Sequence, residues 1–155
     1  MAVRPAHAPD RYSVHPSLAL VSAWIAKLSQ SSGKSLDEWL RIIARDGPGT
    51  EKRASAWLKA EHGFGTTNAR WLAQRVFRPE SVEADLNPAA YLRQAARDVD
   101  AQYSGRKAAL LPLFDALLTH ASRLGDDVKV CPCKTIVPIY RAHVFAQIKA
   151  PAATR

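Results

Sequence analysis

The spacing of apolar residues changes once along the chain, and this change restricts the fold more than any other feature. Up to about residue 123, apolar side chains recur at the three- and four-residue spacing of amphipathic helices. From Val128 onward, β-branched and aromatic residues dominate and apolar positions alternate. We therefore expect an α+β protein, in which helices come first and a small antiparallel sheet comes last.

Four helices are expected before residue 79, and each carries one tryptophan. The turn sequence DGPGT at 46–50 separates the second from the third, and Gly63 ends the third. Ser35, with Glu38 three residues later, forms a capping box at the start of the second helix. Most of the rings fall on the apolar face of their helix, so we expect them to build a core. The four rings are Trp24, Trp39, Trp57 and Trp71.

The chain divides by composition into two domains. We expect a four-helix domain over residues 12–78 and a small α+β domain over residues 85–151, with two helices and about three strands. Residues 79–84 are polar and are expected to link the domains, and residues 1–11 to form a disordered tail.

Pro112 either kinks the last helix or marks its first turn. The side chains expected to be buried by that helix are Leu110, Phe114, Leu117, Leu118 and Ala121.

The alternating part of the sequence predicts a meander of three short strands. Pro138 indicates that the second strand lies at an edge of the sheet or carries a bulge, because proline has no N–H to donate. Arg141 to His143 form the tight turn before the last strand. The expected strands cover residues 128–131, 134–140 and 144–149.

The chain is basic, with 22 Lys and Arg against 14 Asp and Glu and a net charge of +8 at pH 7. A positive field favours nucleic acid, anionic membranes or acidic proteins as partners, but a mildly cationic surface is the simpler explanation.

The most apolar run, residues 108–118, contains Pro112 and Asp115 and is shorter than the ~20 residues that span a bilayer. The N-terminus lacks a secretory signal, so we expect a cytoplasmic protein with reduced thiols and no membrane partner.

Gly63-Phe64-Gly65, between the third and fourth helices, resembles the turn of a helix–hairpin–helix motif. In that motif the backbone N–H groups of the turn and the positive end of the next helix hold a DNA phosphate. Glu61 stands where the motif usually has an apolar residue, and a helix C-cap followed by an N-cap at Thr66 explains the same sequence. The residues of this hypothetical nucleic-acid site are Gly63, Gly65, Thr66, Thr67 and Arg70.

Two other clusters carry weaker hypotheses. Cys131 and Cys133, at i and i+2 on an expected strand, point to the same face and could share a metal, but the chain has no second cysteine pair, so packed thiols are simpler. Four residues of the expected hairpin could form an anion pocket, although an ordinary solvated strand face is simpler. These four are Lys134, Tyr140, Arg141 and His143.

No nucleotide-binding, hydrolase or metalloprotease motif occurs in the sequence. We therefore expect a binding module rather than an enzyme, with no catalytic residue and no cofactor.

Several stretches resemble known bacterial families. YSVHPSLALVSAWIAKL, SLDEWLRII and WLKAEHGFGTTNARWLAQR resemble the domain-of-unknown-function 4287 family over about residues 12–78. GRKAALLPLFDALL and LGDDVKVCPCKTIVPIYRAHVFAQIKAP resemble the domain-of-unknown-function 5655 family, which often follows the first, over about residues 85–151. The resemblance implies a helical domain followed by an α+β domain, and it implies no activity. Because the second family usually continues into more strand, it also implies a sheet that is incomplete or is completed by a partner.

Two classes of function follow from the sequence. The first is sequence-independent binding of a nucleic-acid phosphate backbone through the Gly63–Gly65 turn. The alternative is protein interaction or self-association through an exposed sheet edge, with a homodimer paired through Val144–Ile148 and no catalytic activity. A single basic face beside the turn favours nucleic acid, and an even scatter of charge does not. The residues that decide this are Arg41, Arg45, Lys52, Arg53, Lys59, Arg70, Arg75 and Arg78.

Overall fold

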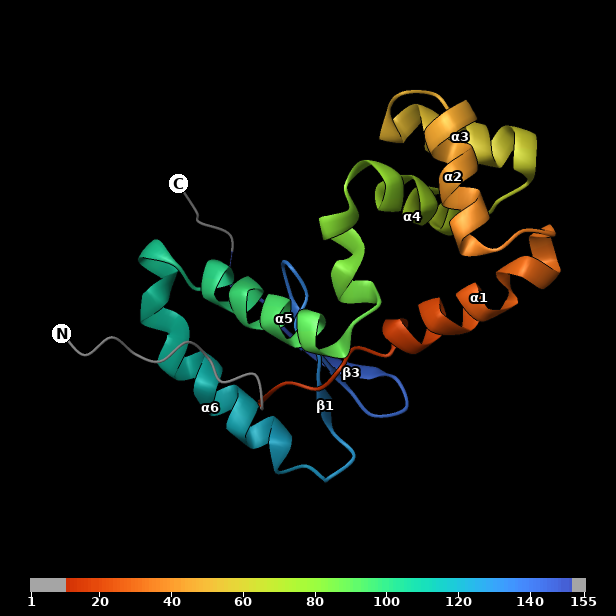
Figure 1. The fold of residues 1–155 in the computed structure, drawn as a ribbon. Helices are drawn as coiled ribbons and strands as arrows, with labels where there is room; N and C mark the ends of the chain where they lie inside the picture. Colours follow the sequence, from red (N-terminus) through yellow and green to blue (C-terminus); the bar gives the residue numbers. More distant parts are fainter. Residues whose placement is uncertain (1–10, 152–155) are drawn as a thin grey trace. The chain divides into compact units, whose positions relative to one another are not determined.

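A computed structural model of the chain describes residues 11–151, which form two compact units (Figure 1). The helical unit is Pro16–Asn87, and the α+β unit is built from the residues up to His15 and from Pro88 onward. The expected α+β class is confirmed, since the described helices precede a three-stranded antiparallel sheet. The expected tail, residues 1–11, lies outside the described residues except for Arg11.

The helical unit contains the four expected helices, and local capping explains where they begin and end. At the start of the second helix, the Ser35 N–H donates to the Glu38 carboxylate at 2.7 Å and the Glu38 N–H donates to Ser35 Oγ at 3.3 Å, which completes the capping box. Gly33 and Gly63 adopt positive φ values and end the first and third helices. The helices are α1 (Ser17–Ser32), α2 (Leu36–Asp46), α3 (Glu51–His62) and α4 (Thr66–Phe77).

Tryptophan rings build much of the core of the helical unit. Trp39 and Trp71 are buried, and Trp24 and Trp57 are half-buried. The Trp39 indole N–H donates to Ser32 Oγ at 2.8 Å, so its buried polar atom is satisfied. Trp24 meets Trp71 edge to face, with ring centroids 5.4 Å apart.

The segment expected to be a linker packs onto the helical unit instead. Pro79–Asp85 forms a 3-10 helix, η2, with proline at its first turn, where its missing N–H costs nothing. Val82 is only 2% exposed and belongs to the same core as Leu72. The Trp71 indole N–H donates to the Asp85 carboxylate at 3.1 Å. Only one buried valine and one hydrogen bond hold this segment in place. Because residues 79–84 are otherwise polar, their composition did not predict the contact.

The α+β unit has two longer helices, a 3-10 helix and a sheet in the order β1-β2-β3. Pro112 lies in the first turn of the second helix and does not kink it, which selects one of the two expected alternatives. None of the described helices has both the length and the apolar character needed to cross a membrane. The elements are α5 (Pro88–Gln102), η3 (Gly105–Leu110), α6 (Leu111–Ser122), β1 (Lys129–Val130), β2 (Val137–Tyr140) and β3 (Val144–Ile148).

The expectation that Pro138 marks an edge strand is wrong, because β2 is the central strand. The Pro138 carbonyl accepts from the Cys131 N–H at 3.1 Å, so the nitrogen of Pro138 faces the β1 side as well. The last residue of β1 that pairs with β2 is Val130, opposite Ile139. The absent N–H of Pro138 therefore removes no hydrogen bond of the β1–β2 ladder. The alternative, a bulge, is close to what occurs, since the register shifts between Ile139 and Tyr140.

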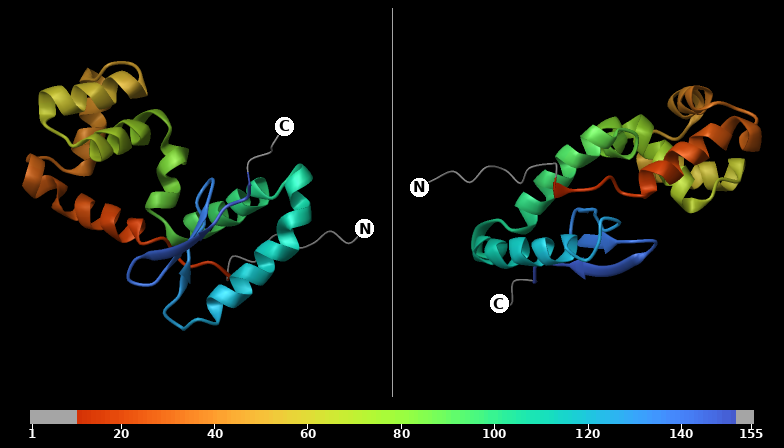
Figure 2. Two further views of the ribbon diagram at one scale, coloured as in Figure 1. Left: turned by 180° about the vertical axis from the view of Figure 1, so that it is seen from behind. Right: turned by 90° about the horizontal axis from the view of Figure 1, so that it is seen from below.

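The residues that precede the helical unit pack along the sheet of the α+β unit. The Ser13 N–H donates to the Val130 carbonyl at 2.8 Å, and the Tyr140 hydroxyl lies 2.9 Å from His15 Nε2. The expected boundary at residue 12 is therefore wrong in position: residues 11–15 belong to the α+β unit, and the helical unit is inserted after them. This segment occupies the outer edge of β1. Within the described chain, β3 is hydrogen-bonded on one side only, to β2. Figure 2 shows the sheet, in blue, from two further sides.

Candidate functional site

The Gly63-Phe64-Gly65 turn is built as the end of one helix followed directly by the start of the next. Gly63 has a φ of 69°, and the N–H groups of Gly63 and Phe64 point back to the Leu58 carbonyl, with the Phe64 bond at 3.2 Å. Gly65, not Thr66 as expected, is the N-cap of α4, with ordinary extended backbone angles. The two N–H groups at the start of the turn are thus already used inside the protein.

A polar groove of about 600 Å³ nevertheless lies beside this turn, and we call it the turn groove. Aromatic rings line one part of it: Trp39 meets Phe64 at 4.9 Å and His62 at 5.0 Å between ring centroids. The Lys34 ammonium lies 5.3 Å from the centroid of Trp39. The lining residues are Trp24, Ser31, Ser32, Lys34, Trp39, His62, Gly63, Phe64, Gly65 and Asn68.

The structure separates the residues of the expected nucleic-acid site. Gly63 and Gly65 line the turn groove, whereas Thr66, Thr67 and Arg70 are exposed and do not line it. Glu61 is exposed and is also outside the lining. The expected site did not include Lys34, whose approach to the turn depends on how the helices pack, or Asn68, which lies in the first turn of α4.

None of the eight basic residues that were to decide between the two functions lines the turn groove, and two of them are paired with carboxylates. The helical unit carries ten Lys and Arg against eight Asp and Glu, so its net charge is small. Arg45 is paired with Asp46 at 2.7 Å, and Arg78 with Glu51 at 2.7 Å. Lys34 is the one Lys or Arg among the residues that line the groove in the described chain.

Cys131 and Cys133 are free thiols, the first buried and the second half-buried. β1 ends at Val130, so the two thiols do not share a strand face as expected. Burial raises the pKa of Cys131 to about 11 and also raises the pKa of Cys133. Among residues 11–151, no three His, Cys, Asp or Glu side chains are grouped so that they could hold a metal ion.

Buried polar side chains hold this cysteine segment in place. The Tyr91 hydroxyl donates to the Pro132 carbonyl at 2.8 Å, and the Gln102 amide donates to the Cys133 carbonyl at 2.8 Å. Burial raises the pKa of Tyr91 far above its usual value, which keeps the phenol protonated as the donor. These contacts hold the Cys131–Cys133 segment, which contains Pro132, in its buried position.

The expected anion pocket on the hairpin is only partly assembled. Tyr140 is directed to His15, and Lys134 is exposed and does not join the others. Arg141 lies 3.3 Å from the Asp127 carboxylate, and its guanidinium also donates to the Leu124 carbonyl. Of the four residues, Arg141 and His143 line a common hollow.

Apolar side chains gather on a different surface, formed by α6 and β3. Six large hydrophobic residues are exposed in the described chain, and five of them lie on or next to these two elements; the sixth, Leu20, is in α1. Each of the five leaves between 43% and 58% of its surface exposed. We call this the α6–β3 surface, and its exposed members are Leu113, Leu117, Leu124, Val144 and Phe145.

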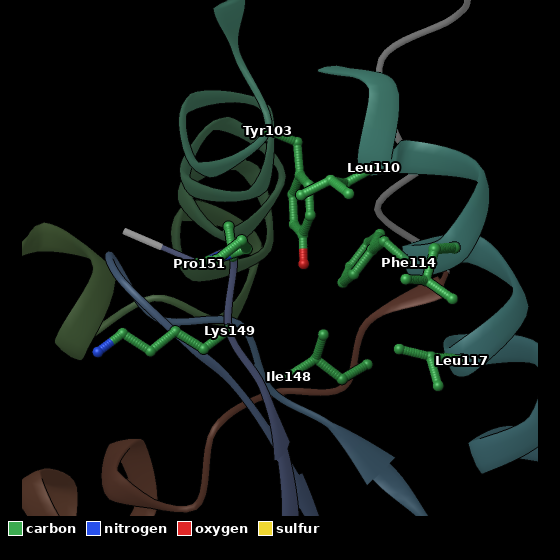
Figure 3. Close-up of a pocket in the computed structure, with 9 residues that line it drawn as sticks. Tyr103, Leu110, Phe114, Leu117, Ile148, Lys149 and Pro151 are labelled. Atoms are coloured by element: carbon green, nitrogen blue, oxygen red, sulfur yellow. The ribbon is translucent and has the colours of Figure 1, made fainter. Parts of the chain in front are cut away.

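Three neighbouring hollows follow this surface. The first, of about 170 Å³, is shown in Figure 3, where Ile148 points toward Phe114 and Leu117 and Lys149 extends to the other side. The second, of about 460 Å³, shares Leu117, Ile148 and Lys149 with the first. The third, of about 520 Å³, is joined to the second through Leu124 and Phe145. The three hollows are therefore neighbours, and residues of α6 and β3 line them.

Phe145 occupies a special position in the strand. Ala146 pairs with Ile139 and Val144 with Tyr140, so Phe145 is the extra residue of the bulge. A bulge redirects side chains and is frequent at sheet edges. Here it places a half-exposed phenyl ring against both the second and the third hollow.

The sequence predicted the exposed last strand but not the contribution of α6. Leu117 was expected to be buried, and it is 43% exposed. The signal was present in the sequence: α6 has apolar residues on more of its circumference than one buried stripe requires. Sequence alone did not show which of them the sheet covers.

The comparisons with known proteins agree with the division of the chain. Residues 21–77 match the family model described as domain of unknown function (DUF4287), and residues 99–155 match that described as domain of unknown function (DUF5655). The two expected resemblances are thereby confirmed, one in each unit. Neither a curated protein nor a solved structure matches the chain significantly.

Proposed function

We propose that this chain is a protein-interaction module, in which the open edge of β3 and the α6–β3 surface bind another polypeptide. One observation carries the proposal: the edge without a described neighbour is the edge beside the exposed apolar side chains. Edge strands offer unpaired N–H and C=O groups to an added strand. Val144–Ile148 contains neither the charge nor the proline that commonly protects such an edge.

The magnitudes favour an added strand over apolar contact alone. Burying the remaining half of each exposed side chain gains about 1 to 1.5 kcal/mol, and thus roughly 5 to 8 kcal/mol for the five. Association costs about 4 to 15 kcal/mol in lost freedom of motion. Apolar burial therefore only offsets this cost. The backbone hydrogen bonds of an added strand supply the remainder, and we expect affinities in about the micromolar range.

A second copy of the chain is one polypeptide that the edge can accept. Antiparallel pairing of two β3 strands about a two-fold axis at Ala146 sets Val144 opposite Ile148 and Phe145 opposite Gln147. No charged residue falls within this pairing. The homodimer expected from the sequence is thus one form of the proposed function.

The proposal is tested by comparing the wild type with a variant whose surface is made polar. A random-peptide display library is selected against the wild type and against the double variant Leu117→Glu, Phe145→Glu, and sedimentation equilibrium is run on both. Circular dichroism confirms that the variant is folded. We expect the wild type to select peptides, or to form a dimer, and the double variant to do neither. Leu20→Glu is the control, because Leu20 is also an exposed large hydrophobic residue but lies in α1. If neither peptide binding nor a dimer is lost in the double variant, the proposal is wrong.

A second candidate function is weak, sequence-independent binding of nucleic acid at the turn groove. The specific observation that favours it is the combination of aromatic side chains, the Lys34 ammonium and the start of α4 along one polar groove. Bases stack on aromatic rings, and phosphates accept from helix N-termini and lysine. The near balance of charge in the helical unit makes this the weaker candidate.

Fluorescence anisotropy with single-stranded and duplex oligonucleotides at low salt tests this candidate. Binding should weaken with salt by a slope of about −0.7 per phosphate neutralised on single strands. Lys34→Ala should weaken binding and lower that slope, and Arg70→Ala tests the contribution expected from the sequence. Lys59→Ala is the control, because Lys59 is exposed and does not line the groove. No binding at low salt, or equal effects of Lys34→Ala and Lys59→Ala, would remove the candidate.

A further inference from the structure

We propose that the first hollow of the α6–β3 surface binds a small uncharged cyclic molecule that carries one hydrogen-bond-accepting oxygen, as a cyclic ketone does. This inference goes beyond the proposed function, because its ligand is a small molecule and needs no pairing with the open backbone edge of β3. It stands on the volume of the hollow and on one buried hydroxyl group that points into it.

The hydroxyl of Tyr103 is the polar group that the hollow offers to a ligand. Tyr103 directly follows α5 and is only 4% exposed. Its ring packs on Phe114 with centroids 4.6 Å apart, and Figure 3 shows its oxygen pointing into the space between Phe114, Ile148 and Pro151. Within residues 11–151 this hydroxyl forms no hydrogen bond. A buried polar group without a partner is costly, so a molecule that supplies one is favoured.

The other side chains that line the hollow give an organic molecule an advantage over water. They are apolar except for Lys149, whose side chain extends away from the hollow in Figure 3. A buried water usually has about three polar partners, and here one side-chain hydroxyl is directed into the space. An organic ligand needs only one such partner, because its remaining surface gains contact with the apolar lining.

The chemistry of the hollow favours an uncharged ligand with an accepting oxygen. No Asp, Glu or Arg of the described chain lines the hollow, and the Lys149 ammonium is directed elsewhere. A charged ligand would therefore lose hydration without compensation. Burial raises the pKa of Tyr103, so its hydroxyl stays protonated at neutral pH and can donate.

The volume of the hollow limits the size of the ligand. The hollow measures about 170 Å³, and an apolar protein cavity of roughly 150 Å³ holds one benzene molecule. A six-membered ring with one attached oxygen, about seven non-hydrogen atoms, therefore matches the space. Its carbon atoms would contact Leu110, Phe114 and Ile148 while its oxygen faces Tyr103.

Three probes of about this size test the inference in methyl NMR titrations that follow Ile148 and Leu117. They are cyclohexanone, methylenecyclohexane, in which a CH₂ group replaces the oxygen, and the charged pentanoate. We expect cyclohexanone to bind in about the millimolar range, since the ligand has few atoms. Pentanoate should bind more weakly than cyclohexanone, because the hollow offers its charge no partner.

Two tyrosine variants isolate the contribution of the hydroxyl. Tyr103→Phe keeps the ring and should weaken cyclohexanone binding roughly 3- to 10-fold while leaving methylenecyclohexane unchanged, because one hydrogen bond is lost. Tyr12→Phe is the matched control, because Tyr12 is also buried with an unpartnered hydroxyl in the described chain but does not line the hollow. It should leave the binding of both probes unchanged.

Three outcomes would overturn the inference. The first is that cyclohexanone does not shift the methyl signals of Ile148 and Leu117. The second is that Tyr103→Phe affects the two uncharged probes equally, and the third is that pentanoate binds more tightly than cyclohexanone. None of these bears on the proposed function, which is measured separately by peptide selection and sedimentation.

Discussion

The backbone N–H of Ser13 donates to the carbonyl oxygen of Val130 at 2.8 Å, so residues that precede the helical unit pair along the outer edge of β1. This contact closes one edge of a three-stranded sheet whose other edge, β3, has no neighbour in the described chain. It also means that the α+β unit is assembled from two segments separated by the whole helical unit.

The first prediction tests this edge contact. Ser13→Pro removes the N–H donor, and we expect a loss of about 1 kcal/mol in the free energy of unfolding, because a typical internal hydrogen bond contributes that much. Ser13→Ala keeps the donor and is the control. Urea denaturation monitored by circular dichroism measures both. Equal stability of the two variants would show that the segment does not pair with β1 in solution.

The two glycines of the turn should respond differently to the same substitution. Gly63 has a φ of 69°, which an alanine adopts at a cost of about 1 to 2 kcal/mol. Gly65 has a φ of −64° and an open space where a Cβ would lie, so Gly65→Ala should be tolerated and can even stabilise slightly. Thermal unfolding of the two variants checks this. Greater damage at Gly65 than at Gly63 would contradict the turn geometry.

A third prediction concerns η2, which the sequence presented as a linker. Val82→Ala removes two buried methyl groups from the core of the helical unit, and we expect a loss of about 2 kcal/mol. Glu80→Ala changes an exposed position of the same 3-10 helix and should have little effect. Denaturant titration gives the two values. If residues 79–84 behave as a free linker, both substitutions will be neutral.

The cysteines should be unreactive in the native protein. With the pKa of Cys131 raised to about 11 by burial, only about a thousandth of this thiol is ionised at pH 8, and the thiolate is the reactive form. We expect slow reaction with Ellman's reagent at pH 8, a rise in rate as pH increases, and rapid reaction of both thiols in guanidinium chloride. Rapid native reaction of two thiols at pH 8 would show that the segment is open.

The candidate sites show why the sequence was informative to different degrees. The Gly63–Gly65 turn and the strand β3 were both identified, because glycine conformations and alternating patterns are local properties. The turn groove also needed Lys34 and Asn68, and the α6–β3 surface also needed Leu113, Leu117 and Leu124. Lys34, Leu113, Leu117 and Leu124 come from other segments, and their approach depends on packing that no local pattern records. Asn68 lies in the first turn of α4, so its position next to the turn is a local property.

The sequence by itself determined the elements of this protein. Local features set where helices and strands begin and end: the spacing of hydrophobic residues, capping residues such as Ser35 and Thr50, and the positive φ that glycine can adopt. The tertiary structure decided how those elements combine. It placed β2 with Pro138 at the centre of the sheet, moved residues 11–15 to the α+β unit and anchored η2 through Val82. Each of these depends on contacts between residues distant in sequence, where a few buried atoms and hydrogen bonds outweigh local composition.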